Sequence, residues 1–142
     1  MKLVLTMCLL GFMQMIFAQT TTITININSI RNSKGTVKWA VYNKEANFNS
    51  TEAGFADAGE IKAKEGTVTV KTKPLPDGTY AISVFHDENN NSDVDFNFLG
   101  LPVEGFGFSQ NPTIYFGPPK FKECTFVKKG NNTQSVKMKY YL

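Results

Sequence analysis

Hydrophobic and polar residues alternate along much of the chain, and this period of two predicts β-strands rather than helices. Residues 23–27 alternate isoleucine with threonine and asparagine, as expected for a strand with one buried face. Residues 37–41 repeat the pattern with valine, tryptophan and valine, and the sequence Asn-Ser-Lys-Gly at 32–35 separates the two segments. A turn signal between two alternating segments predicts a β-hairpin here.

The same alternation recurs later in the chain. We expect strands over residues 67–72, 80–85, 120–128 and 134–141, whereas residues 51–58 are less regular and predict a short helix or a surface loop. Short strands, frequent turn signals and little helical periodicity indicate an all-β protein. We therefore expect a single antiparallel β-sandwich of Greek-key type.

The apolar positions of these segments predict the core, and the turn at residues 75–78 supports the fold class. The expected core residues are Trp39, Val41, Val68, Tyr80, Ile82, Val84 and Phe126. The turn Leu-Pro-Asp-Gly contains a proline that presets φ and a glycine that accepts a positive φ. Where it leads into a central strand, it resembles the corresponding corner of transthyretin-like sandwich domains.

The first residues do not fit the sandwich. Met1 and Lys2 precede an apolar run over residues 3–17, and Ala18 stands before a polar stretch, which is the pattern of a secretory signal peptide. The run is short for a membrane span, which needs about 20 apolar residues. We therefore expect a signal peptide over residues 1–18, one domain over residues 19–142, and an exported protein, periplasmic or secreted, with no transmembrane segment after cleavage.

Removal of the leader changes the net charge and the number of cysteines in the mature chain. The formal net charge is only +3, and the leader carries one of the lysines, so nucleic acid is not an expected partner. Cys8 lies in the leader, which leaves Cys124 as the single cysteine of the mature chain. Cys124 and Phe126 fall on one face of the expected strand, and we expect a buried, unreactive thiol.

An acidic loop follows the strand that ends near His86. Residues 81–119 contain five acids and no lysine or arginine, although the whole chain has 15 basic residues. Crowded carboxylates repel one another unless they are solvated or share a cation.

The spacing within this loop favours a cation. Asp87, Asn89, Asn91 and Asp95 reproduce positions 1, 3, 5 and 9 of an EF-hand calcium loop, and Asp93 would supply position 7, normally a backbone carbonyl. The match fails at position 6, where Ser92 replaces glycine, and at position 12, where Phe98 replaces glutamate. Glu104 is the nearest downstream carboxylate that could replace the missing ligand. The alternative is a solvated set of Asx-turns at a strand end.

The segment after the acids is rich in phenylalanine and glycine. More than twenty residues without clear strand periodicity are unusual in a compact domain and are often functional. Phe96, Phe98, Phe106 and Phe108 could line a pocket for an apolar or sugar ligand, and we favour instead a small core that orders the loop.

Several motifs together resemble a known family. They are Tyr-Ala at 80–81 with His-Asp-Glu-Asn-x-Asn at 86–91, Phe-Leu-Gly-Leu-Pro at 98–102, Glu-Gly-Phe-Gly-Phe-Ser at 104–109, and Phe-Gly-Pro-Pro-x-Phe at 116–121. Over residues 20–142 the chain resembles a family of secreted bacterial proteins catalogued only as a domain of unknown function. The resemblance implies an exported β-protein and brings no established activity. Members usually carry Asn-Gly-Asn-Gly where this chain has Asn-Asn-Asn-Ser at 89–92.

The functional hypothesis is an exported binding or structural module with a calcium-stabilised loop, whose expected partner is an envelope or extracellular ligand. The alternative is a small hydrolase of esters or glycosides that uses His86, Asp87 and Glu104. No Gly-x-Ser-x-Gly motif supplies a nucleophile, and a zinc site would need more histidine or cysteine than the chain has. His86 is expected to donate a hydrogen bond that orients the loop.

The leader should be removed after Ala18, because the short apolar run is followed at once by Gln19 and threonines. Intact-mass measurement of natively exported protein should give a chain that begins at Gln19. Recovery of a membrane-bound chain that still begins at Met1 would contradict both the cleavage and the export.

Overall fold

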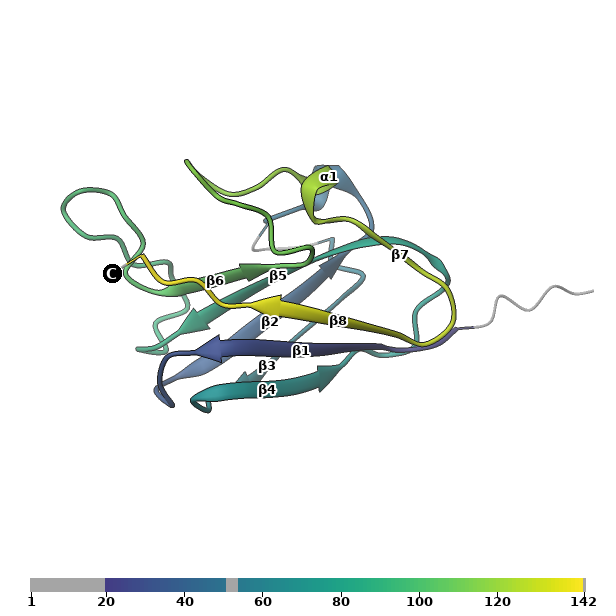
Figure 1. Ribbon diagram of the computed structural model, residues 1–142, viewed down its shortest axis with the longest axis horizontal. Helices are drawn as coiled ribbons and strands as arrows, with labels where there is room; N and C mark the ends of the chain where they lie inside the picture. Colours follow the sequence, from purple (N-terminus) through teal and green to yellow (C-terminus); the bar gives the residue numbers. More distant parts are fainter. Residues whose placement is uncertain (1–19, 51–53, 142) are drawn as a thin grey trace, which may run out of the picture.

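A computed structural model describes residues 20–50 and 54–141, so the expected leader lies outside the described residues. Two β-sheets stack face to face (Figure 1). The smaller sheet has the strand order β4-β1-β8. Its central strand is β1 (Ile23–Ile30), flanked by β4 (Gly66–Lys71) and β8 (Asn132–Lys137). The expected all-β sandwich is confirmed.

The larger sheet has the order β3-β2-β5-β6. Its strands are β2 (Thr36–Tyr42), β3 (Asp57–Lys62), β5 (Gly78–Asp87) and β6 (Gly105–Phe108). A further strand, β7 (Phe126–Lys128), pairs with the first residues of β5. The longest strand, β5, is thus bordered by three others and leads directly into the acidic loop.

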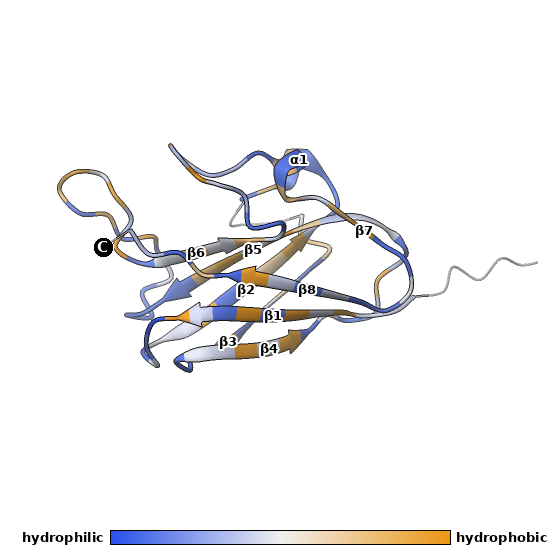
Figure 2. Cartoon of the chain, viewed as in Figure 1, coloured by the Kyte–Doolittle hydropathy of each residue, from blue (hydrophilic) through white to orange (hydrophobic). Residues whose placement is uncertain are grey.

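The core lies between the inner faces of the two sheets. Ile23, Ile25 and Ile27 of β1 are fully buried, and the same alternation buries Val37, Trp39 and Val41 of β2. Apolar segments recur along the strands of both sheets (Figure 2). All seven residues expected in the core, from Trp39 to Phe126, belong to one hydrophobic cluster.

The expected hairpin between residues 23–27 and 37–41 is wrong. β1 pairs with β4 and β8, whereas β2 pairs with β3 and β5, so the turn at 32–35 connects one sheet to the other. The two apolar faces meet across the core instead of lying side by side. Period-two alternation identifies a buried face but carries no information on which strand is its neighbour.

Two further details differ from expectation. β1 and β8 run parallel, so the sandwich is antiparallel in every strand pair described except this one. Residues 121–124 form a short helix, α1 (Phe121–Cys124), and only residues 126–128 of the expected strand at 120–128 are extended. Glu123 explains the helical turn, because its Oε2 accepts a hydrogen bond from the backbone N–H of Lys120 at 2.7 Å.

Of the segment at 51–58, residues 51–53 lie outside the described residues. Residues 57 and 58 begin β3 rather than a helix, and a short 3-10 helix, η1 (Glu45–Asn47), precedes the segment. Within the described residues, no helix is long and apolar enough to cross a membrane.

The long segment after the acidic loop contains a strand that alternation did not reveal. β6 alternates glycine with phenylalanine, and its glycines face the smaller sheet. A Cβ on Gly107 would lie 2.6 Å from Cγ1 of Val136, and one on Gly105 would collide with the ring of Tyr140. Glycine is therefore required by the close approach of the C-terminal segment, which hides the usual strand signal.

Truncation of Ile82 tests the facing of β5. Ile82 is fully buried, so Ile82→Ala should lower the free energy of unfolding by about 2–5 kcal/mol in urea denaturation. Val127→Ala is the matched control, because Val127 is a strand residue with 62% of its surface exposed and should change stability by less than about 0.5 kcal/mol. Equal losses in the two variants would show that the facing is wrong.

Candidate metal centre in the acidic loop

The acidic loop starts from two consecutive buried residues at the end of β5. His86 and Asp87 have no exposed surface. Because side chains alternate along a strand, the two residues lie on opposite sides of the sheet. His86 shares the inward face of Ile82 and Val84, and Asp87 shares the outward face of Phe85. The burial of β5 thereby determines where both polar side chains lie.

The Asp87 carboxylate has one satisfied and one unsatisfied oxygen. Oδ2 accepts hydrogen bonds from the backbone N–H of Ser92 at 3.0 Å and from Nζ of Lys38 at 2.9 Å. Oδ1 is buried and has no hydrogen-bond partner within the described part of the chain. Burial alone would raise the pKa of Asp87, but the hydrogen bonds from Lys38 and Ser92 outweigh it and hold the pKa below its usual range.

Three further predicted ligands come together. Nδ2 of Asn89 lies 2.6 Å from Oδ2 of Asp95, and Nδ2 of Asn91 lies 3.0 Å from the same oxygen. The amide oxygens each close an Asx-turn, Asn89 with the N–H of Asn91 and Asn91 with the N–H of Asp93. These three side chains therefore lie together, and their binding of a metal stays a prediction.

The tight wrapping of the loop depends on residues with positive φ. Ser92 has φ 65° and Asn90 has φ 58°. Asparagine tolerates this left-handed conformation, but serine adopts it only rarely. Position 92 is thus the place where glycine would relieve strain.

Glu104 and Asp93 occupy different environments. Glu104 is 3% exposed, and its two oxygens accept the N–H groups of Glu88 at 2.9 Å and Asp95 at 3.4 Å, so it joins the two ends of the loop. The Asp93 side chain is exposed.

In residues 20–50 and 54–141, no group of three or more His, Cys, Asp or Glu side chains is placed to hold a metal ion. A cation site here would need the asparagine amides as well as the carboxylates.

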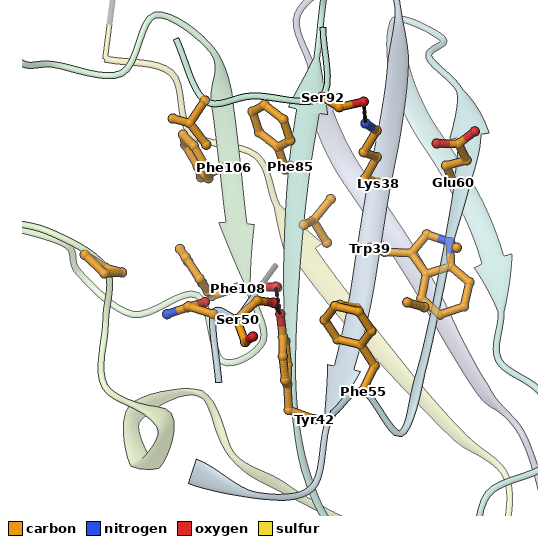
Figure 3. Close-up of a pocket in the computed structure, with 18 of the residues that line it drawn as sticks. Lys38, Trp39, Tyr42, Ser50, Phe55, Glu60, Phe85, Ser92, Phe106 and Phe108 are labelled. Atoms are coloured by element: carbon orange, nitrogen blue, oxygen red, sulfur yellow. Dashed lines mark hydrogen bonds between the residues drawn. The ribbon is translucent and has the colours of Figure 1, made fainter. Parts of the chain in front are cut away.

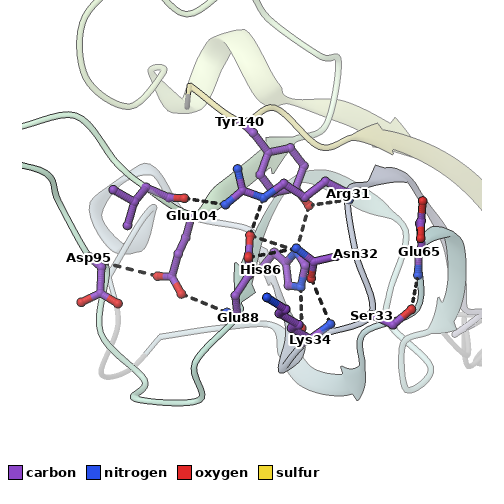
Figure 4. Close-up of polar contacts among 11 residues, drawn as sticks. Arg31, Asn32, Ser33, Lys34, Glu65, His86, Glu88, Asp95, Glu104 and Tyr140 are labelled. Atoms are coloured by element: carbon purple, nitrogen blue, oxygen red, sulfur yellow. Dashed lines mark hydrogen bonds and ion pairs between the residues drawn. The ribbon is translucent and has the colours of Figure 1, made fainter.

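His86 joins three segments of the chain (Figure 4). Its Nε2 lies 2.7 Å from the backbone carbonyl of Lys34, which only accepts, so Nε2 carries a proton. Its Nδ1 lies 2.8 Å from the hydroxyl of Tyr140, and that hydroxyl accepts the N–H of Arg31 at 3.2 Å. In the neutral histidine, the hydroxyl therefore donates to Nδ1. His86 therefore donates to the inter-sheet turn, whereas the sequence predicted a hydrogen bond that orients the acidic loop.

Glu88 extends this network to the surface. Its carboxylate accepts hydrogen bonds from Nε of Arg31 at 2.7 Å and from Nδ2 of Asn32 at 3.0 Å, and Arg31 also donates to the carbonyl of Val103. Burial alone would raise the pKa of Glu88, and the contacts with Asn32 and Arg31 lower it below its usual range. The arginine thus links the inter-sheet turn to both sides of the loop.

The alternative catalytic residues are not assembled as an acid–base set. No hydrogen bond among the described residues joins His86 to Asp87 or to Glu104, and both ring nitrogens of His86 already have partners.

Cys124 is fully buried, as expected, but in α1 instead of on a strand face. Burial first, and the charge of Glu123 second, raise the pKa of its thiol to about 12.

The phenylalanines of the loop divide into two pairs. Phe108 is buried in a small cluster with Ala81 and Cys124, and Phe106 stacks on Phe85 with ring centroids 5.1 Å apart. Phe96 and Phe98 are 61% and 95% exposed, so they form neither a loop core nor a pocket. The expectation that they order the loop is wrong.

Sequence reasoning missed the basic partners of the loop. Lys38 lies on β2, 49 residues before Asp87, and Arg31 and Asn32 lie in the inter-sheet turn, 57 and 56 residues before Glu88. The surplus of acid at 81–119 implied that compensating cations must come from elsewhere, but no local pattern identifies which ones.

The fold and the loop define a class: a small all-β sandwich protein with an acidic, asparagine-rich loop at the end of a central strand. A family model matches residues 25–136, and its description is uncharacterized protein conserved in bacteria (DUF2141). The chain belongs to this family. No curated protein and no solved structure matches it.

Acidification should destabilise the protein through Asp87 and Glu88. Because both pKa values are lowered in the folded state, their stabilising contribution is complete above the ordinary values of 3.8 and 4.5 and is lost as the pH falls through the folded ones. The free energy of unfolding should therefore fall from about pH 5 downward, as urea denaturation can measure.

The Asp87→Asn variant should lose about 1.5–3 kcal/mol at neutral pH, the usual value for hydrogen bonds to a charged group, and should lose less on further acidification. Glu65→Gln removes an exposed acid whose side chain makes no hydrogen bond in the described part of the chain, and it serves as the control. Identical acid profiles for the wild type and Asp87→Asn would contradict the assignment.

Proposed function

We propose that this protein is an exported β-sandwich module whose acidic loop is stabilised by a bound calcium ion. One observation carries the proposal, namely the buried Oδ1 of Asp87, which has no hydrogen-bond partner among the described residues. A buried carboxylate oxygen without a partner costs about 1–3 kcal/mol or more, so such atoms are rare in folded proteins. A cation would satisfy this oxygen while Oδ2 keeps its contacts with Lys38 and Ser92.

The neighbouring side chains supply the ligand chemistry that calcium prefers. Calcium takes 6–8 oxygen ligands, from carboxylates, amide carbonyls, backbone carbonyls and water. Asn89, Asn91 and Asp95 already lie within hydrogen-bond distance of one another. Small rotations would turn the amide oxygens and the Asp95 carboxylate toward a shared ion. Asp93 would contribute its backbone carbonyl, and Glu104 would hold the two ends of the loop together.

Charge supports a divalent cation in the same place. Lys38 and Arg31 each compensate one carboxylate, Asp87 and Glu88. In the described residues, no ion pair involves Asp93, Asp95 or Glu104, and so the loop keeps a negative excess. Crowded carboxylates gain most from a multivalent counterion.

Export and the envelope ligand rest on the leader. The apolar run at residues 3–17 with Ala18 supports secretion, to the periplasm or beyond the cell. Calcium is abundant enough outside the cytosol for modules that bind it with dissociation constants on the order of 10⁻⁴–10⁻³ M. The ligand of the module would then be an envelope or extracellular component.

Calcium should raise the melting temperature, because it would bind the folded loop and not the unfolded chain. At a free concentration 100 times the dissociation constant, the added stability is about 2.7 kcal/mol. The titration should extend to tens of millimolar, roughly ten times the upper dissociation constant expected for extracellular modules. Magnesium should be less effective, because it requires tight octahedral geometry and retains its waters.

Three variants sharpen this test. Asp87→Asn should remove most of the calcium shift, whereas Asp93→Asn, with the same charge change in the same loop, should retain most of it because its side chain is not a ligand. Ser92→Gly should strengthen binding by relieving the positive φ. If calcium leaves the melting curve unchanged in the wild type and in Ser92→Gly, the loop is a solvated set of Asx-turns.

A further inference from the structure

A groove of about 700 Å³ lies on the larger sheet, away from the core. Its lining comes from residues of β2, β3, β5 and β6, from the loop at 92–94, and from Asn49, Ser50, Phe55 and Pro118 (Figure 3). An outer sheet face normally carries polar side chains in contact with water. The outer face of the larger sheet is instead hollow and largely apolar.

Small residues in the middle and aromatic residues at both ends create the hollow. Ala40 and Ser83 are opposite each other on β2 and β5, and both line the groove. At the end near the acidic loop, Phe85 and Phe106 stack with ring centroids 5.1 Å apart (Figure 3). At the other end, Tyr42 lies against Phe55, with ring centroids 5.5 Å apart.

Three charged residues line the groove, and one of them is already neutralised. Lys38 holds its Nζ 2.9 Å from the fully buried Asp87 carboxylate. Glu60 and Asp93 have no ion pair or side-chain hydrogen bond within the described part of the chain. The groove therefore presents two uncompensated carboxylates beside a set of aromatic rings.

This combination selects a positively charged ligand. Aromatic faces carry partial negative charge and attract ammonium groups within about 6 Å, by about 0.5–1 kcal/mol at exposed sites and more when water is excluded. The two carboxylates add to this attraction, and the small floor residues leave room for an apolar body. A neutral apolar ligand would leave the carboxylates unused, and an anionic one would be repelled by them.

We propose that this groove binds an organic cation, a compound with an apolar body and a protonated or quaternary amine. The amine would lie near Glu60 and Asp93, and the apolar body would lie over Ala40 and Ser83 between the aromatic ends. None of the proposed contacts of the amine is to a metal, so binding is expected in the presence of a calcium chelator.

Three compounds that share one apolar body and differ in charge measure the effect of ligand charge on binding. The protein is titrated in chelator with 4-phenylbutylamine, 4-phenylbutanol and 4-phenylbutyrate, which are cationic, neutral and anionic at neutral pH. Calorimetry gives the dissociation constants, and the fluorescence of Trp39, the single tryptophan, is followed as a second signal because this core residue also borders the groove. The amine should bind about tenfold more tightly than the alcohol, which corresponds to about 1.4 kcal/mol, and the carboxylate should bind most weakly.

Variants distinguish the contribution of the two carboxylates to binding from the contribution of the groove's shape. The double variant Glu60→Gln, Asp93→Asn should abolish the preference for the amine while keeping the affinity for the alcohol. Ala40→Leu should fill the floor and weaken all three compounds. Glu65→Gln removes the same charge outside the groove lining and should leave the preference unchanged.

Equal affinity for the three compounds, a preference for the carboxylate, or no saturable signal in either measurement would overturn the proposal. Retention of the amine preference in the double variant would also overturn it.

Discussion

The burial of β5 is the constraint on which the rest of the structure depends. Its inward residues Ile82 and Val84 fill the core, and it pairs with β2, β6 and β7. Because side chains alternate along a strand, this burial also decides that His86 ends up on the core side and Asp87 on the outer side. The positions of the polar network and of the acidic loop therefore follow from the burial of an apolar strand. A register slip of one residue would turn the inward-facing side chains of β5 outward and the outward-facing ones inward.

Asp87 connects the loop to the outer face of the same sheet. Its carboxylate ends β5, accepts the N–H of Ser92 across the loop, and contacts Lys38 on the neighbouring strand. Lys38 in turn lines the groove. A divalent ion at Asp87 would therefore act on two regions at once, since it would stabilise the loop and reduce the counter-charge available to the lysine. The proposed metal centre and the proposed cation groove are neighbours connected by the ion pair between Asp87 and Lys38.

The inter-sheet turn and the C-terminal segment hold the other side of the loop. His86 contacts Lys34 and Tyr140, and Arg31 contacts both Glu88 and Val103. These contacts bring together residues from the beginning, middle and end of the described chain. The same C-terminal segment passes so close to β6 that only glycine fits at positions 105 and 107. One packing requirement thus explains both the glycine–phenylalanine alternation and the position of Tyr140.

The sequence by itself determined the features that depend on neighbours along the chain. Period-two alternation identified β1, β2, β4, β5 and β8 and the seven core residues, and the short loop brings Asn89, Asn91 and Asp95 together because a few residues leave little freedom. Only the tertiary structure decided that β1 and β2 belong to different sheets, that β6 is a strand, and that Lys38 compensates Asp87. The groove between Phe85, Phe106 and Tyr42 was likewise beyond prediction. Alternation records which residues are buried, whereas the choice of neighbouring strand arises from packing between segments that are distant in the chain.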